Sequence, residues 1–185
     1  MMAGRPARGF VLVVALGLLL ALTVGSLAAA RTTTLELRMA RNATDAVLAF
    51  HAAEAALVDA ERWLVEGGGD PVDTFTAAGT GGLATSPDYG GMPPWRRSDV
   101  WKEGRVPESS VPGVEQQPRY LIEWLTTLTD TGPKDNPLQP VTMDVFGVTA
   151  RGTGATAGVT VTLQSTFGRA QDGSRARRLS WTELP

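Results

Sequence analysis

One segment constrains this chain more than any other: from Phe10 to Ala30 no residue is charged, and most side chains are apolar. A helix rises about 1.5 Å per residue, so a run of this length can cross a bilayer core about 30 Å thick. Helix-forming residues continue past Arg31, where polar side chains enter, as far as Glu66. The sequence therefore predicts one long helix, first apolar and then amphipathic.

The charges around the apolar segment predict its orientation. Arg5 and Arg8 precede it, and the first acidic residue of the chain is Glu36. Because basic residues stay on the cytoplasmic side of a membrane, we expect a cytoplasmic N-terminus and an extracytoplasmic domain. About 155 residues follow the segment, which is the size of one ordinary domain.

Three interpretations of the segment stay open at this point. A secretory signal would be cut after the A-x-A pattern of residues 28–30, but its apolar region would be shorter, about 7 to 15 residues. A plain single-pass anchor would stay uncut. A prepilin would be cut between Gly9 and Phe10, after a short basic leader, and its mature chain would keep the apolar helix as a packing surface.

The amphipathic part of the helix has an apolar face with steps of three and four residues, which is typical of packing on a sheet. This face comprises Leu35, Met39, Ala43, Val47, Phe50, Ala53, Leu57, Ala60 and Leu64. The opposite side carries Glu36, Arg38, Arg41, Asp45, Asp59 and Arg62. We expect residues 57–64 to be core, whereas residues 35–50 could instead pack against neighbouring subunits.

A connection rich in Gly and Pro follows the helix. Gly67, Gly68 and Gly69 are expected to end the helix. Turn signals then recur up to residue 118. The aromatic residues of this connection predict that it is ordered, with a short turn of helix or strand over residues 99–102. They are Phe75, Tyr89, Trp95 and Trp101.

The remaining chain alternates as strands do. Strands are predicted over 119–128, 141–152, 158–168 and 178–184, with a bulge at Gly147 and a turn over residues 152–154. Short turns between consecutive strands predict an antiparallel meander that covers the apolar face of the helix. The predicted fold is α+β: a long N-terminal helix packed on a C-terminal antiparallel sheet.

The sequence offers little catalytic chemistry. The chain has no cysteine and one histidine, and its net charge of −2 gives no overall attraction to nucleic acid. His51 and Glu54 are interpreted as a polar pair on the helix surface or between helix and sheet, because a metal site would need more ligands. Asp130, Asp135 and Asn136 do not match a calcium loop. We therefore expect no enzyme activity, no cofactor, no metal and no nucleic-acid partner.

Two strings in the helix carry a resemblance to a known family. They are TTTLELRMARN, at residues 32–42, and LAFHAAEAAL, at residues 48–57. Residues 8–61 resemble the N-terminal segment of the PilX family of minor type IV pilins. Residues 148–169 and 177–184 are similar to the C-terminal domain of the same family, more weakly.

The resemblance implies a processing site and a fibre role. It implies cleavage of a prepilin leader after Gly9 and N-methylation of Phe10. Most type IV pilins have a glutamate at the fifth mature position, which is Val14 here, and the PilX-like group often lacks it. The chain then divides into a leader (1–9), a transmembrane part of the helix (10–30), an amphipathic part (31–66), an irregular connection (67–118) and a sheet (119–185).

The family also implies where the protein acts and with what. The expected location is the inner membrane, as a single-pass protein with a periplasmic C-terminal domain, and then the pilus or fimbrium on the cell surface. The expected partners are the prepilin peptidase, inner-membrane lipid, other minor pilins and pilin subunits, and a tip adhesin. The expected role is to prime or cap pilus assembly at the tip. The alternative is a single-pass or secreted periplasmic binding domain whose helix is only an anchor or signal.

Overall fold

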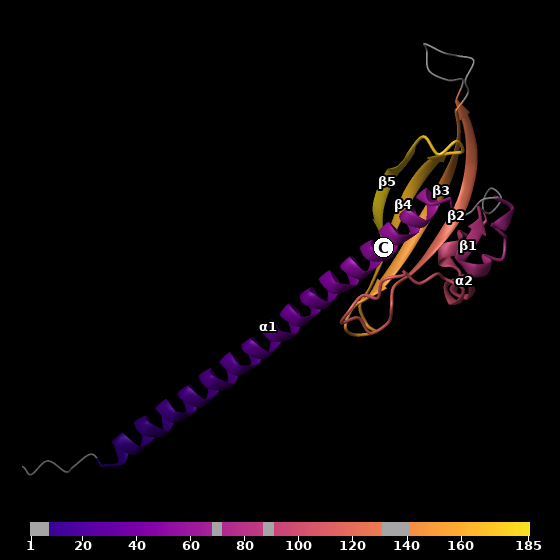
Figure 1. The fold of residues 1–185 in the computed structure, drawn as a ribbon. Helices are drawn as coiled ribbons and strands as arrows, with labels where there is room; N and C mark the ends of the chain where they lie inside the picture. The colour runs from indigo at the N-terminus through magenta and orange to yellow at the C-terminus, as the bar shows by residue number, and fades with distance from the viewer. Residues whose placement is uncertain (1–7, 68–71, 87–90, 131–140) are drawn as a thin grey trace, which may run out of the picture. The chain divides into compact units, whose positions relative to one another are not determined.

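The computed structural model describes residues 8–67, 72–86, 91–130 and 141–185. A long helix, α1 (Arg8–Val65), packs on a five-stranded sheet, which confirms the α+β prediction (Figure 1). The strands are β1 (Leu83–Thr85), β2 (Arg119–Asp130), β3 (Val141–Thr153), β4 (Thr160–Ala170) and β5 (Ala176–Leu184). The other elements are α2 (Ser98–Lys102) and the 3-10 turns η1 (Val72–Thr74), η2 (Thr80–Gly82) and η3 (Pro94–Arg96).

The chain forms two compact units, which divide between Ala43 and Thr44 within α1. The described part of the first unit is helical throughout. The second unit holds the rest of α1 and the whole sheet. Its helix ends where the sequence predicts: Gly67 has a φ of 89°, and its amide donates to the carbonyl of Leu64 at 3.3 Å. A left-handed glycine is a common end for a helix.

The sheet order is β1-β2-β3-β4-β5, and β2 to β5 form the predicted antiparallel meander. Sequence analysis missed β1, which pairs in parallel with β2 and places Leu83 opposite Ile122. A strand of three residues is too short to show an alternating pattern. The segment predicted to be irregular therefore supplies one edge of the sheet.

The predicted bulge at Gly147 is wrong. Gly147 pairs in register with Glu123 on one side and Thr166 on the other. The pairing of β2 with β3 shifts instead between Trp124 and Thr126. A glycine within a strand commonly marks either a bulge or a place where another backbone approaches closely, and the sequence around it does not distinguish the two.

The predicted turn over residues 152–154 is also wrong, because β3 continues to Thr153. A Cβ atom at Gly152 would overlap the carbonyl oxygen of Ala49 and the amide nitrogen of Ala53. The glycine thus lets strand and helix backbones touch. The helix meets the sheet with small side chains that are fully buried: Ala49, Ala52, Ala53, Ala56 and Ala60.

The apolar helix face is buried only in part. Leu57 and Leu64 lie in the main core with Ile122, Phe146 and Leu163 of the sheet, which confirms the prediction for residues 57–64. Val47, on the same predicted face, stays exposed. Leu35 and Met39, in the first unit, are exposed as well.

Two acidic residues predicted on the outer side of the helix are buried instead. Asp45 and Asp59 are 9% and 8% exposed. Asp45 is covered by the β3–β4 loop, where it accepts hydrogen bonds from the amide of Ala155 and the hydroxyl of Thr156. Asp59 pairs with Arg62. Loops wrap the helix beyond the sheet, so the outer side of the helix is not uniformly in solvent.

A smaller cluster lies outside the main core. Val100 and Trp101 of α2 pack on Leu121 of β2, with Trp95 beside them, and the Trp101 ring nitrogen donates to the Trp95 carbonyl at 2.7 Å. Phe75 is buried in the main core. The ordered connection is therefore confirmed for these rings, whereas Tyr89 lies outside the described residues.

Candidate functional site

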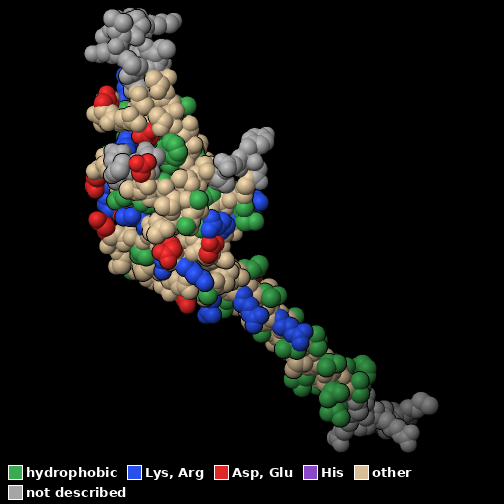
Figure 2. Space-filling model, turned by 90° about the vertical axis from the view of Figure 1, so that its right-hand side faces the viewer, with side chains coloured by type: hydrophobic (Ala, Val, Ile, Leu, Met, Phe, Trp, Pro, Cys, Tyr) green, Lys and Arg blue, Asp and Glu red, His purple; other side chains and the backbone are tan. Residues whose placement is uncertain are grey.

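The apolar segment of α1 is exposed along its whole length. Every residue from Phe10 to Ala43 is exposed, and the most apolar window of this helix has a mean hydropathy of 2.6 with none of it buried. Figure 2 shows hydrophobic side chains around this segment, followed by Lys and Arg side chains along the helix. A helix that is apolar on all sides needs lipid or other helices around it. This surface is the candidate assembly site.

The hydroxyl groups within the segment do not make it polar. Thr23 donates to the carbonyl of Leu20, and Ser26 donates to that of Leu22, both at 2.8 Å. A hydroxyl bonded to its own helix backbone leaves no unpaired donor facing hydrocarbon. The segment can therefore remain in a bilayer or in a dry bundle of helices.

The predicted processing residues lie at the start of this surface. Gly9 and Phe10 belong to the first turns of α1, and the Phe10 ring is 71% exposed. The predicted leader lies outside the described residues up to residue 7. Val14 is 43% exposed on the same helix. Cleavage after Gly9 and methylation of Phe10 stay predictions.

Of the two polar residues His51 and Glu54, Glu54 makes the predicted contact between helix and sheet, and His51 stays on the helix surface. His51 is exposed and packs edge-on against Phe50, with ring centroids 5.9 Å apart. Glu54 accepts a hydrogen bond of 2.6 Å from the ring nitrogen of Trp181 on β5. Among the described residues, no group of three His, Cys, Asp or Glu side chains could hold a metal. Asp135 and Asn136 lie outside the described residues.

A second acidic side chain ties α1 to the sheet, and sequence analysis missed it. Glu61 accepts two hydrogen bonds from the Arg178 guanidinium, at 2.8 and 2.9 Å, and one from the Ser165 hydroxyl at 2.7 Å. The hydrogen bond to Glu61 raises the pKa of Arg178 above its usual value. Glu54 and Glu61 are seven residues apart, so they lie on one helix face. The spacing of seven residues was the feature of the sequence that could have predicted these two contacts with the sheet.

Two family models match the sequence. One is described as Type IV pilus assembly protein PilX C-term and matches residues 69–169, and the other, PilX N-terminal, matches residues 8–58. The first alone covers more than half of the chain. The chain belongs to the PilX family. Comparisons with curated proteins and with solved structures gave no match.

Family membership explains the exposed helix. The chain is a minor pilin of type IV pilus assembly, and its long apolar helix makes it a membrane-anchored pilin. PilX family proteins are structural components of the pilus and interact with its other components. The resemblance found in residues 8–61 is thereby confirmed, as is the weaker one within residues 148–169.

Proposed function

We propose that this minor pilin is cleaved after Gly9, methylated on Phe10, and inserted into the pilus through residues 10–30 of α1, where it primes or caps assembly at the tip. Before assembly the same segment holds it in the inner membrane with the C-terminal domain in the periplasm. Its partners are the prepilin peptidase, inner-membrane lipid, other pilin subunits and a tip adhesin. Its work is structural and needs no catalysis or cofactor.

The exposed apolar helix is the observation that carries this proposal. Phe10 and the apolar residues after it are exposed, and none of the most apolar window is buried by the part of the chain that the structure describes. Relative to exposure in water, burying apolar surface contributes about 25 cal/mol per Å², so outside the membrane such a helix is stabilised by packing in a bundle. Transfer from lipid to a helix bundle exchanges one apolar environment for another, which makes extraction from the membrane feasible.

Val14 supports a place at the end of the fibre. In most pilins a carboxylate at this position pairs with the amino group of a neighbouring subunit. A charged group in an apolar environment is expensive unless it has a partner. Valine neither offers that partner nor needs one, so a subunit with Val14 fits the end of a fibre better than its shaft.

The N-terminus of the mature protein tests the proposal. Intact-mass measurement of the protein from membranes should give a chain that begins at Phe10 and carries one added methyl group. A chain that begins at Arg31 would establish a secreted domain instead. An uncut chain would establish a plain anchor.

A pair of glycine variants makes the test specific. Gly9→Leu should leave the leader attached, because a bulky side chain at the cleavage position blocks the peptidase. Gly17→Leu is the matched control, since a Cβ at Gly17 meets nothing within 4 Å. Normal cleavage of the Gly9→Leu protein would contradict the proposed processing site.

A further inference from the structure

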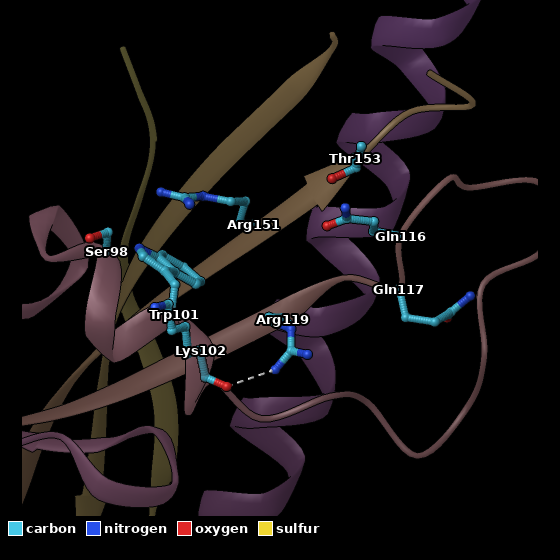
Figure 3. Close-up of a pocket in the computed structure, with 8 residues that line it drawn as sticks. All are labelled: Ser98, Trp101, Lys102, Gln116, Gln117, Arg119, Arg151 and Thr153. Carbon is cyan, nitrogen blue, oxygen red and sulfur yellow. Dashed lines mark hydrogen bonds between the residues drawn. The ribbon is translucent and has the colours of Figure 1, made fainter. Parts of the chain in front are cut away.

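A polar pocket lies beside α2, at the end of the sheet where β2 begins and β3 ends (Figure 3). Its volume is about 270 Å³, and it is lined by α2, by the connection from α2 to β2 and by both strands. Three of its side chains are cationic, Lys102, Arg119 and Arg151, and none of the described residues that line it is acidic. The other lining residues are Ser98, Trp101, Gln116, Gln117 and Thr153. The pocket is therefore electropositive.

The strand register places two of these cationic residues at paired positions of neighbouring strands. Arg119 of β2 is the direct cross-strand partner of Arg151 of β3. Like charges in directly opposite positions destabilise a sheet. Among the described residues, the Arg119 guanidinium donates to two backbone carbonyls, those of Gly104 at 2.9 Å and Lys102 at 3.3 Å, and to no carboxylate. The side chains themselves point apart, that of Arg119 toward Lys102 and that of Arg151 over Trp101 (Figure 3), so each guanidinium faces the pocket separately.

Arg151 is the least exposed of the three cationic residues. Its guanidinium lies over the Trp101 ring, 4.1 Å from the ring centroid, and its Nε atom is buried without a hydrogen-bond partner among the described residues. Burial lowers the pKa of Arg151 from its usual value. A buried donor left without a partner costs about 1 to 3 kcal/mol. The Trp101 ring holds the guanidinium of Arg151 in place, so its terminal nitrogens are preorganised for a ligand.

The size and chemistry of the pocket select the ligand. A volume of about 270 Å³ lies below the range of about 300–1,000 Å³ typical of drug-sized ligands, so a nucleotide is too large. Trp101 is buried and already covered by Arg151, so a sugar finds little free ring to stack on. Guanidinium groups bind planar carboxylates through two parallel hydrogen bonds.

We propose that this basic pocket binds a carboxylate, and that in the assembled pilus the carboxylate is an Asp or Glu side chain of a neighbouring protein subunit. The second part rests on the proposed function. The first part concerns the pocket alone and is tested without any pilus.

Calorimetric titration of the full chain in detergent micelles tests the first part. Glutarate should bind saturably, its neutral isostere glutaramide should not bind, and inorganic phosphate should bind more weakly than glutarate. Arg151→Gln should weaken glutarate binding by about tenfold or more, the value of one charge-assisted hydrogen bond. Lys102→Gln, at an exposed position, should weaken it several-fold without affecting folding.

Arg177→Gln is the matched control, because it removes the same charge from an exposed position on β5, at the other edge of the sheet. It should leave the affinity for glutarate unchanged. Equal weakening by Arg177→Gln, equal binding of glutaramide, tighter binding of phosphate, or no saturable binding would each overturn the carboxylate site.

Incorporation into pili tests the second part. If a neighbouring subunit supplies the carboxylate, Lys102→Gln and Arg151→Gln proteins should be processed normally but enter pili several-fold less than the unmodified protein. Normal incorporation of both variants, with glutarate binding lost, would overturn the neighbouring subunit as the source. Failure of the unmodified protein to enter pili would instead contradict the proposed function.

Discussion

Gly152 of β3 packs directly against the backbone of α1, where a Cβ atom at this glycine would overlap the carbonyl oxygen of Ala49. Neither partner is a side chain that could rotate away. The close contact sets how near the helix lies to the sheet within the second unit. Both backbones would have to move to accommodate any larger residue.

Gly152→Ala should therefore destabilise the second unit. Overpacking of a well-packed core costs about 1–3 kcal/mol, and a clash with backbone belongs at the upper end of this range. Unfolding of the full chain in detergent micelles, followed by tryptophan fluorescence, would measure the loss. Gly158→Ala is the matched control, since its Cβ meets nothing within 4 Å. Equal stability of the two variants would contradict the close contact.

Asp45→Ala should also destabilise the second unit. The carboxylate accepts from the amide of Ala155 and the hydroxyl of Thr156, and its loss leaves these donors without a partner in the fold. The expected cost is about 1–3 kcal/mol in the free energy of unfolding. Hydrogen exchange should become faster at the Ala155 amide in particular. Asp73→Ala, at an exposed position, should change neither quantity.

Glu61→Ala should loosen β5. Its removal leaves Arg178 without its ion-pair partner and the buried hydroxyl of Ser165 without its acceptor. Because Arg178 is partly exposed and can reach water, we expect a loss of about 2 kcal/mol, less than for a fully buried pair. Amide exchange along residues 176–184 should rise. An unchanged exchange rate there would show that strand pairing alone holds β5.

The contribution of Glu123 to the free energy of unfolding should fall as pH rises, which is the opposite of the usual effect of a carboxylate. Burial raises the pKa of its carboxyl group, while a hydrogen bond with Ser86 opposes this shift. The folded state therefore holds this proton more tightly than the unfolded state does, so the contribution of Glu123 becomes less favourable as pH rises through the raised pKa.

Glu123→Gln should consequently stabilise the protein at neutral pH, by less than about 1 kcal/mol because the side chain is partly exposed. The gain should vanish below about pH 4, where the carboxyl is protonated in both states. Unfolding midpoints of the variant and the unmodified protein, compared from about pH 4 to neutral pH, would measure this gain in stability. Glu115→Gln, at an exposed position, is the control and should give a flat difference. A gain that grows toward acidic pH would contradict the expected sign.

Val14→Glu tests the proposed place in the fibre. It restores the carboxylate that most pilins carry at this position, so the variant should appear along the pilus shaft rather than only at its ends. Immunogold labelling of isolated pili would show the distribution. Val13→Glu adds the same charge one residue away and should reduce assembly without such a redistribution. Identical labelling of both variants would mean that the position of the carboxylate is unimportant.

Local pattern was sufficient for the main elements of the fold. The apolar run, the helix end at Gly67 and the strands after Arg119 depend on periodicity and on turn residues that are adjacent in sequence. The family resemblance depended on strings within the helix, and these too are local. The candidate assembly surface could therefore be predicted from sequence alone, because its apolar character depends only on residues that are adjacent in the chain.

Tertiary structure decided what distant segments do to one another. The register of β2 and β3 brings Arg119 opposite Arg151, and the β3–β4 loop buries Asp45. Leu83 belongs to a strand because the edge of β2, at Ile122, is there to pair with it. Periodicity reports which face a residue lies on, but not what the rest of the chain places against that face. The apolar segment thus marked this protein as a membrane-anchored helix, while the basic pocket and the helix–sheet contact arose from pairings that no local pattern records.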